Sequence, residues 1–257
     1  VLFATVAYAN HSWGKYHWNL STAQSTINPL KLGNNLTTPA WTSSLTGASS
    51  DWNVSVLKNQ VVAGSNTACS PVLGGVEICN NTYGNNNWLG IAQIWVYRGK
   101  DGHIAQALVK VNDTYFNTPQ YNTPAWKNAV MCQEVGHTLG LGHQDENFDN
   151  PNLGTCMDYT NDPDGLISGQ LDNQHPNQHD YDMLTEIYAH LNSPDNGGKP
   201  GKGGGNGKPA GVGANVDLNN PSTWGQAVRQ DARGNNSLFK RDLGNGQELF
   251  TFVIWAR

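Results

Sequence analysis

The stretch at residues 133–143, Gln-Glu-Val-Gly-His-Thr-Leu-Gly-Leu-Gly-His, constrains the fold more than any other part of the chain. Helix positions four residues apart lie on one face, so Gln133 and His137 would point the same way. Gly140 is a helix stop, and a bend there lets His143 reach back toward that face. The sequence therefore predicts a helix that ends at a glycine and brings three polar side chains to one place.

The same helix has a clear beginning. Thr123 fits the N-cap and Pro124 the first helical position, where the missing N–H of proline does no harm. Apolar side chains then recur at steps of four residues and define a core-facing side; these are Met131, Val135 and Leu139. We expect Gln133 and His137 to lie on a different face of the helix.

Two imidazoles and a carboxylate in this arrangement suit metal-assisted hydrolysis. Neutral imidazole is a common zinc ligand, and zinc with an open position lowers the pKa of its water to about 7 and polarises a carbonyl group. Glu134 would take the proton and pass it to the leaving amine. An isolated Glu-x-x-His is usually a pair of polar residues on a protein surface. The metal-site interpretation therefore depends on the other motifs in the chain.

A second motif, Cys156-Met157-Asp158-Tyr159, follows downstream. With both motifs, the sequence from about Tyr16 to Leu191 resembles the metzincin clan of zinc endopeptidases, whose long motif precedes a tight turn that carries a Met beneath the metal site. The order of elements is similar to that of matrixin-like members. The resemblance implies an α+β fold, with a twisted mixed sheet, an active-site helix and a C-terminal helix, followed here by a small β-rich tail.

The resemblance also implies roles wherever residues match. These are zinc ligation by His137 and His143, general-base catalysis by Glu134, the bend at Gly140, the Met-turn at Met157 and, as in astacin-like and serralysin-like members, a tyrosine beside the zinc at Tyr159. Matrixins lack that tyrosine, so the chain mixes features. The alternative for Tyr159 is a packed ring whose hydroxyl is satisfied within the fold.

Gln133 stands where the first zinc-binding His is expected. Its amide oxygen could ligate zinc as a neutral donor, or another imidazole could fold over the site, from His175, His179 or His190. In a third explanation the site is metal-poor and the chain is inert. A site without metal needs neither Glu134 nor the two motif histidines, which favours the first explanation. We therefore expect Gln133, His137 and His143 as ligands of Zn²⁺.

The expected function is that of a secreted zinc metalloendopeptidase acting on protein or peptide substrates. Two alternatives stay open, namely a catalytically inert pseudoprotease that binds peptides or polymers, and a zinc hydrolase of a non-peptide amide. Calcium is a further candidate ion, because residues 144–150 and 158–164 supply oxygen ligands of the kind it takes, although neither run has EF-hand spacing. His103 beside Asp101 matches too few ligands for a structural metal site.

Charge and hydropathy limit the classes of partner that the chain could bind. Across the 257 residues, 15 Lys and Arg against 20 Asp and Glu give a net charge of −5, and the basic residues are scattered. The sequence therefore lacks the cluster of basic residues that is typical of a nucleic-acid-binding surface. No apolar run approaches the roughly 20 residues that a membrane-spanning helix needs. We expect a soluble monomer that binds neither nucleic acid nor membranes.

Four cysteines, an even number, suit two disulfides in an oxidising compartment. Cys69 and Cys79 lie close together around a Gly-Gly turn and form an easy pair. Cys132 and Cys156 would then tie the motif helix to the segment that carries Met157. The alternative is four buried free thiols, which a reducing cytosol would permit.

The chain divides into four parts. Residues 1–15 are either the remnant of a signal peptide, with a small-x-small pattern at Ala7-Tyr8-Ala9, or a first strand. Residues 16–192 form the metzincin-like catalytic domain. Residues 193–213, rich in Gly, Pro and Lys, form a flexible linker, and residues 214–257 form a small β-rich segment with a hairpin turn from Leu243. That segment either packs back on the main domain or belongs to a longer module.

Apolar and alternating runs predict strands in the main domain at residues 16–18, 30–32, 61–63, 90–97 and 104–112. A helix over residues 38–56 is expected to break at Gly47. A last helix over residues 178–191 closes the domain.

Overall fold

The computed structural model describes residues 10–257 except 21, 66–67, 101, 168 and 193–215. Within these residues, nine strands form one mixed sheet in the order β3-β2-β4-β6-β5-β9-β8-β7, with β1 also paired to β6. The strands are β1 (His17–Trp18), β2 (Leu30–Asn35), β3 (Asn59–Ala63), β4 (Gly75–Asn81), β5 (Trp88–Tyr97), β6 (His103–Asn112), β7 (Gln226–Gln230), β8 (Asn236–Gly244) and β9 (Gln247–Trp255).

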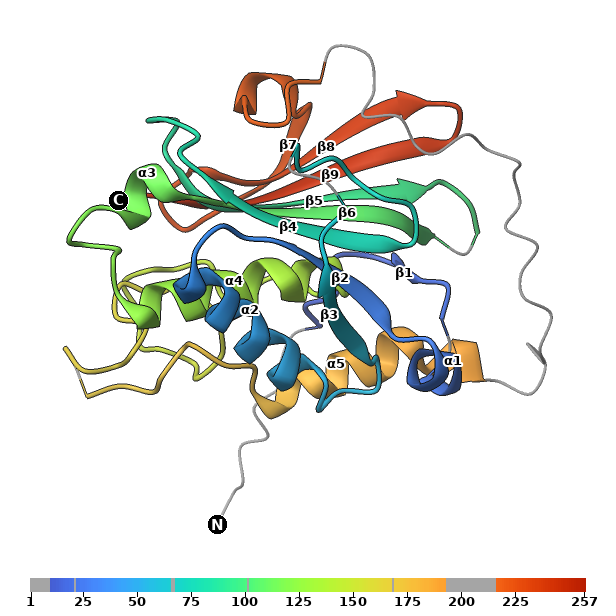
Figure 1. The fold of residues 1–257 in the computed structure, drawn as a ribbon, viewed down its shortest axis with the longest axis horizontal. Coiled ribbons are helices and arrows are strands. Elements are labelled where there is room, and N and C mark those ends of the chain that lie inside the picture. Colours follow the sequence, from blue (N-terminus) through green and yellow to red (C-terminus); the bar gives the residue numbers. More distant parts are fainter. Residues whose placement is uncertain (1–9, 21, 66–67, 101, 168, 193–215) are drawn as a thin grey trace.

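The long helices gather on one side of this sheet (Figure 1). The helices are α1 (Thr22–Ile27), α2 (Pro39–Trp52), α3 (Asp113–Phe116), α4 (Pro124–Thr138) and α5 (Gln178–Ala189), with short 3-10 turns η1 (His190–Asn192) and η3 (Pro221–Thr223). Apolar side chains from α2, α4 and α5 and from the facing side of the sheet form one large buried core. None of the described helices has the length and apolar character that a bilayer crossing requires.

The sheet changes character at β5. Strands β2, β3, β4 and β6 pair in parallel, as does β1 with β6. Strand β5 is antiparallel to both of its neighbours, β6 and β9, and the antiparallel pattern continues through β8 to β7. The α+β class predicted from the sequence is therefore confirmed at this level.

Helix α4 begins and ends as its sequence predicts. The Thr123 side chain accepts a hydrogen bond from the backbone N–H of Trp126 at the N-cap, and Pro124 follows in the first turn. The helix stops at Thr138, just before Gly140. However, α4 is buried on nearly all sides, because α2 and the sheet enclose it, so its polar motif face is also an interior face.

Helix α2 runs unbroken through Gly47, so the expected break there is wrong. A glycine inside a helix costs only about 0.5–1 kcal/mol relative to alanine. The Thr38 side chain caps the first turn, and buried Trp41, Leu45 and Trp52 anchor the helix on the core. These contacts outweigh the cost of a single glycine.

Strand β4 was not among the predicted strands. Its polar Glu77 and Asn80 interrupt the apolar pattern, yet both are buried and paired. Glu77 accepts hydrogen bonds from Asn35 Nδ2 (2.5 Å) and the Ser65 N–H (3.1 Å), and Asn80 Nδ2 donates to Asp113 (2.5 Å). Tertiary partners therefore let polar residues occupy a central strand.

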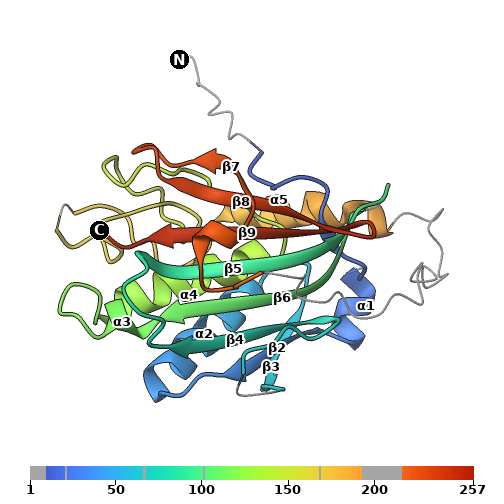
Figure 2. The same ribbon diagram turned by 90° about the horizontal axis from the view of Figure 1, so that it is seen from above.

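The C-terminal residues 216–257, here called the C-terminal unit, pack back on the rest of the chain and extend its sheet (Figure 2). Strand β9 pairs with β5 from Trp88↔Trp255 to Tyr97↔Gln247. Asn245 and Gly246 form the predicted hairpin turn, both with positive φ, which suits a tight connection of this type. The whole of the expected linker at 193–213, and the expected leader pattern at residues 7–9, lie outside the described residues.

Both predicted disulfides are present. Cys69 is bonded to Cys79 on β4, and Cys132 on α4 is bonded to Cys156. The described residues include no free cysteine, so the alternative of four buried thiols is wrong.

Close packing beneath α4 makes Gly136 sensitive to substitution. A Cβ there would lie 2.5 Å from Met157 Sδ and 2.7 Å from Trp52 Cζ2, whereas a Cβ on Gly47 of α2 would meet no atom within 4 Å. We expect Gly136→Ala to lower the free energy of unfolding by about 1–3 kcal/mol and Gly47→Ala to raise it by about 0.5–1 kcal/mol. Urea unfolding of both variants measures the contrast, and a change of the same sign in both would contradict it.

Candidate functional site

Helix α4 and the loop after it bring the predicted polar residues together. Gln133, Glu134 and His137 come from the last turns of the helix, and His143 follows the bend. Gly140 has a φ of +111°, a conformation that glycine adopts readily and other residues do not. All four polar side chains are buried, with relative exposures between 0% and 6%.

The two motif imidazoles have defined tautomers. His137 Nδ1 lies 2.8 Å from the carbonyl oxygen of Leu141, and His143 Nδ1 lies 2.7 Å from Glu146 Oε1. Because these oxygens accept, each Nδ1 carries the hydrogen and each Nε2 keeps a lone pair. The ring centroids are 4.5 Å apart. Burial, and next the neighbouring His143, hold the pKa of His137 well below its usual value, which favours the neutral ligand form.

Gln133 has an amide of defined orientation. Its Nε2 donates a hydrogen bond of 2.8 Å to the carbonyl oxygen of Cys156, which can only accept, and this fixes which end of the amide is nitrogen. Its Oε1 is buried and has no hydrogen-bond partner among the described residues. The side chain therefore presents a neutral oxygen donor at the position where the sequence motif lacks an imidazole.

The three histidines considered as substitute ligands contact residues outside the motif. His175 Nδ1 lies 2.7 Å from Asp51 Oδ2, His179 Nε2 lies 3.1 Å from His11 Nδ1, and His190 Nε2 lies 3.1 Å from His17 Nε2. The described contacts thus favour Gln133 over a replacement imidazole.

Glu134 lies against Gly90 of β5, a residue that the sequence did not single out. A Cβ on Gly90 would lie 2.7 Å from Val130 Cγ1 and 2.8 Å from Glu134 Oε1, so only glycine allows this approach. Both carboxylate oxygens of Glu134 are buried and have no hydrogen-bond partner among the described residues. Burial raises the pKa of Glu134 well above its ordinary value, which makes this carboxylate a stronger base than one in water.

Glu146 is a second residue whose contact with the motif sequence reasoning missed, since the sequence placed it only in a run of calcium-type oxygens. Its Oε1 accepts from His143, and its Oε2 accepts from Ser237 Oγ at 2.7 Å. Burial alone would raise the pKa of Glu146, but His143, Ser237 and Arg229 together lower it. The signal in the sequence was its position three residues after His143, within reach of the imidazole.

Tyr159 takes the packed-ring arrangement. Its ring centroid lies 4.5 Å from that of His143, and its hydroxyl donates to the carbonyl oxygen of Val253 on β9 at 2.9 Å. Met157, fully buried, lies under α4 against Gly136. Both residues therefore adjoin the motif, and the Tyr159 hydroxyl is engaged by the C-terminal unit.

The C-terminal unit and the first described residues close over the site. Phe252 of β9 stacks on the ring of His137 with centroids 4.1 Å apart and planes 13° apart. Among the first described residues, Trp13 Nε1 donates to the carbonyl oxygen of His137 (3.1 Å), and the Gly142 N–H donates to the carbonyl oxygen of His11 (2.5 Å). The loop that carries His143 is therefore held by a segment far away in sequence.

The donor set fits a zinc ion. Gln133 Oε1 and His143 Nε2 are buried without a hydrogen-bond partner in the described part of the chain, and each such atom costs about 1–3 kcal/mol when left unpaired. Zinc accepts nitrogen and oxygen donors of this kind. No group of three or more His, Cys, Asp or Glu in the described residues is arranged to hold a metal ion. The candidate donors at this site are the two imidazoles and the amide oxygen of Gln133.

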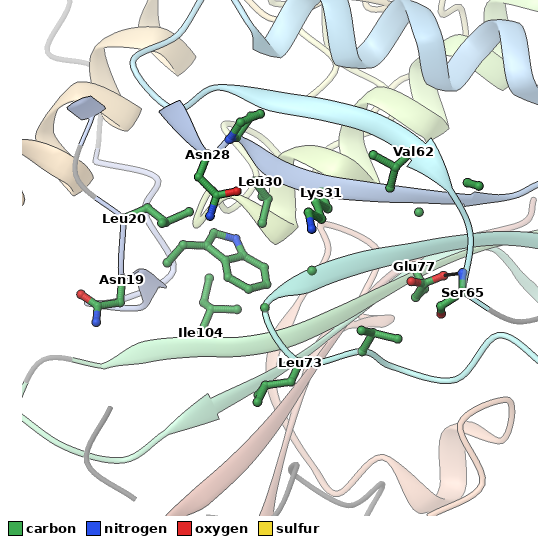
Figure 3. Close-up of a pocket in the computed structure, with 17 residues that line it drawn as sticks. Asn19, Leu20, Asn28, Leu30, Lys31, Val62, Ser65, Leu73, Glu77 and Ile104 are labelled. Atoms are coloured by element: carbon green, nitrogen blue, oxygen red, sulfur yellow. Dashed lines mark hydrogen bonds between the residues drawn. The ribbon is translucent and has the colours of Figure 1, made fainter. Parts of the chain in front are cut away.

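A cavity of about 610 Å³ lies elsewhere, beside β1, β2 and β3, and no motif residue lines it. Figure 3 shows its mostly apolar wall, including Leu20, Leu73 and Ile104, with Glu77 at one side held by Ser65. The described residues that line the cavity include no arrangement of nucleophile and base comparable to the motif, so the buried site on α4 remains the better candidate.

Glu146 should support metal binding through His143. A hydrogen-bond partner on the second nitrogen of a ligating histidine typically contributes 10–100-fold to affinity. We expect Glu146→Gln to weaken zinc affinity by about that factor, measured by competition with a chelator. Glu186→Gln, on the exposed face of α5, is the control and should leave affinity unchanged. Equal zinc affinities in the two variants would contradict a role for Glu146 in metal binding.

Asp158, next to Met157, should make stability depend on pH. Burial raises its pKa to about 7, although the Leu153 N–H and Asn173 Nδ2 donate to Oδ2. A folded-state pKa above the unfolded value gives stability that is present at low pH and lost as pH rises through 7. The advantage of Asp158→Asn in free energy of unfolding should therefore grow by about 2 kcal/mol between pH 5 and pH 8. Urea unfolding across that range checks this, and a constant difference would contradict it.

No protein-family model matches the chain, and no curated protein matches it. Among solved structures, one described as "Structure of Myroilysin" aligns with a TM-score of 0.35 and 11% identity, over 62% of this chain and 79% of that chain. A similarity of this size assigns the chain to no family, so the function has to be inferred from the site.

Proposed function

We propose that the chain is a zinc-dependent endopeptidase that hydrolyses peptide bonds in protein substrates. The observation that carries the proposal is the set of buried polar atoms without partners, namely Gln133 Oε1, both oxygens of Glu134 and His143 Nε2. Folded proteins pair nearly all buried polar groups, and exceptions are found where a ligand or ion binds. Four such atoms from one motif support a site built for a cation and its chemistry.

In this proposal Gln133, His137 and His143 hold the ion. Zinc bound there supplies an activated water and polarises the substrate carbonyl. Leu141 and Glu146 keep the two imidazoles in the tautomer that offers Nε2. The carbonyl oxygen of Cys156 binds the amide nitrogen of Gln133, so the amide oxygen of Gln133 points away from that carbonyl. These contacts set the ligands before any ion arrives, which reduces the cost of ordering them.

Glu134 is the proton carrier. Its carboxylate has no competing hydrogen bond within the described residues, so both oxygens are available to take a proton and to return it to the leaving amine. The apolar surroundings strengthen it as a base. Gly90 leaves room for the carboxylate beneath β5.

The two disulfides support the proposal that the protein works in an oxidising, extracellular compartment.

A second candidate function is the inert binding module. It is favoured by one observation, the complete burial of Glu134 and Tyr159.

Elemental analysis and casein cleavage separate the two. We expect one zinc per chain in the wild type, loss of zinc in Gln133→Ala, and retained zinc in Gln133→His, because imidazole is the stronger donor. Glu134→Gln should keep the zinc and lower cleavage by about 10²–10⁴-fold, since it removes only the base. Incubations must be long, because the site is buried.

The isosteric Glu134→Gln variant serves as the matched control for folding and metal content. A wild type without zinc, in which cleavage appears only in Gln133→His, would overturn the enzyme proposal in favour of the binding module.

A further inference from the structure

The last strand of the chain crosses the candidate site as an extended segment. Strand β9 pairs with β5 in register, with Phe252 opposite Ala92 and Val253 opposite Ile91. Its pairing with β8 on the other side reaches Leu238↔Phe252 and goes no further. The Val253 carbonyl therefore lies beyond the β8 ladder, where it accepts the Tyr159 hydroxyl.

The contacts that β9 makes are with the motif itself. The Phe252 ring lies flat on His137, and its centroid is 6.0 Å from that of His143. The Val253 carbonyl takes the hydrogen bond of Tyr159, whose ring touches His143. One side chain and one main-chain carbonyl of an extended strand thus occupy the surroundings of both imidazoles, which is the space that a peptide substrate would need.

Ion pairs add a second attachment of the C-terminal unit next to the site. Arg229 lies 3.4 Å from Glu146, and Asp149 accepts from Arg233 at 2.6 Å and from Arg257 at 3.4 Å. The Ala232 N–H also donates to the carbonyl oxygen of Glu146 at 3.0 Å. The acidic run after His143 is therefore a docking surface for arginines of the C-terminal unit.

We infer that β9 is the built-in occupant of the site, and that substrate and β9 compete for one position beside β5. The inference rests on the proposed function, because it assigns a regulation to that same site. The described arrangement is then the resting form, with His137, Glu134 and Tyr159 sealed from solvent, and activity requires β9 to leave while the rest of the sheet stays folded. The interface to be broken is the β5–β9 ladder together with the Phe252 and Tyr159 contacts.

A cross-strand disulfide tests this in the full chain. Gln93 on β5 and Thr251 on β9 are direct register partners, both buried, and Gln93 Oε1 and Thr251 Oγ1 have no hydrogen-bond partner among the described residues. The variant Gln93→Cys/Thr251→Cys locks β9 to β5. The matched control, Gln230→Cys/Asn236→Cys, locks β7 to β8 within the same C-terminal unit and leaves β9 free to move.

Two readouts are compared before and after mild reduction, with the single-cysteine variants treated identically. The first is modification of His137 and His143 by diethyl pyrocarbonate in the metal-free protein, with exposed His175 as the internal reference. The second is casein cleavage by the zinc-loaded protein. We expect the β5–β9 lock to slow both at least tenfold and reduction to restore them, with no such effect in the β7–β8 control.

The outcomes separate the two proposals. If the disulfide slows histidine modification but neither the locked nor the reduced protein cleaves casein, β9 is supported as the occupant and the protease function is overturned. Equal modification in locked and reduced protein overturns the role of β9, whatever the cleavage. Should the locked variant misfold, Phe252→Ala is compared with Phe239→Ala, which removes a buried ring from the opposite face of the same unit. Faster His137 modification only in Phe252→Ala supports the inference, and equal rates overturn it.

Discussion

The close packing of α4 against β5 is the constraint on which the rest of the structure depends. Gly90 lets the side chains of Val130 and Glu134 reach the strand, and Gly136 lets the opposite side of the helix rest on Met157. A helix enclosed in this way keeps its polar motif in an apolar interior, where hydrogen-bond acceptors without a partner are costly and a cation that paired with them would remove that cost. The chemistry proposed for the site follows from that burial more than from the identity of any one ligand.

Local signals predicted the parts of the fold that local interactions determine. The cap at Thr123, the stop near Gly140, the β5–β6 hairpin and both disulfides could be predicted from spacing and turn chemistry. Strand β4 and the unbroken α2 could not, because their stability comes from tertiary partners. Glu77 is held by Asn35 of β2 and by Ser65 after β3, and α2 is held by the core beneath it. Propensity is overruled wherever such contacts are strong.

For the candidate site, the motif indicated Gln133, Glu134, His137 and His143, and the structure brings their side chains into one buried region. It could not indicate Gly90 or Phe252, which lie more than 40 and more than 100 residues away along the chain from His137. Their proximity depends on which strand pairs with which, and pairing between distant strands leaves little trace in sequence periodicity. The acidic run after His143 shows the same limit, since its arginine partners belong to the C-terminal unit.

The bond between Cys132 and Cys156 has a consequence beyond holding two segments together. Cys132 precedes Gln133 in the chain, and the Gln133 amide donates to the carbonyl oxygen of Cys156, so a covalent bond and a hydrogen bond join the same two pieces of backbone side by side. The Gln133 amide is thereby held against a piece of backbone that the disulfide also fixes. In the proposed site, the donor expected to bind the ion most weakly is thus the one whose position is secured by a covalent bond one residue away.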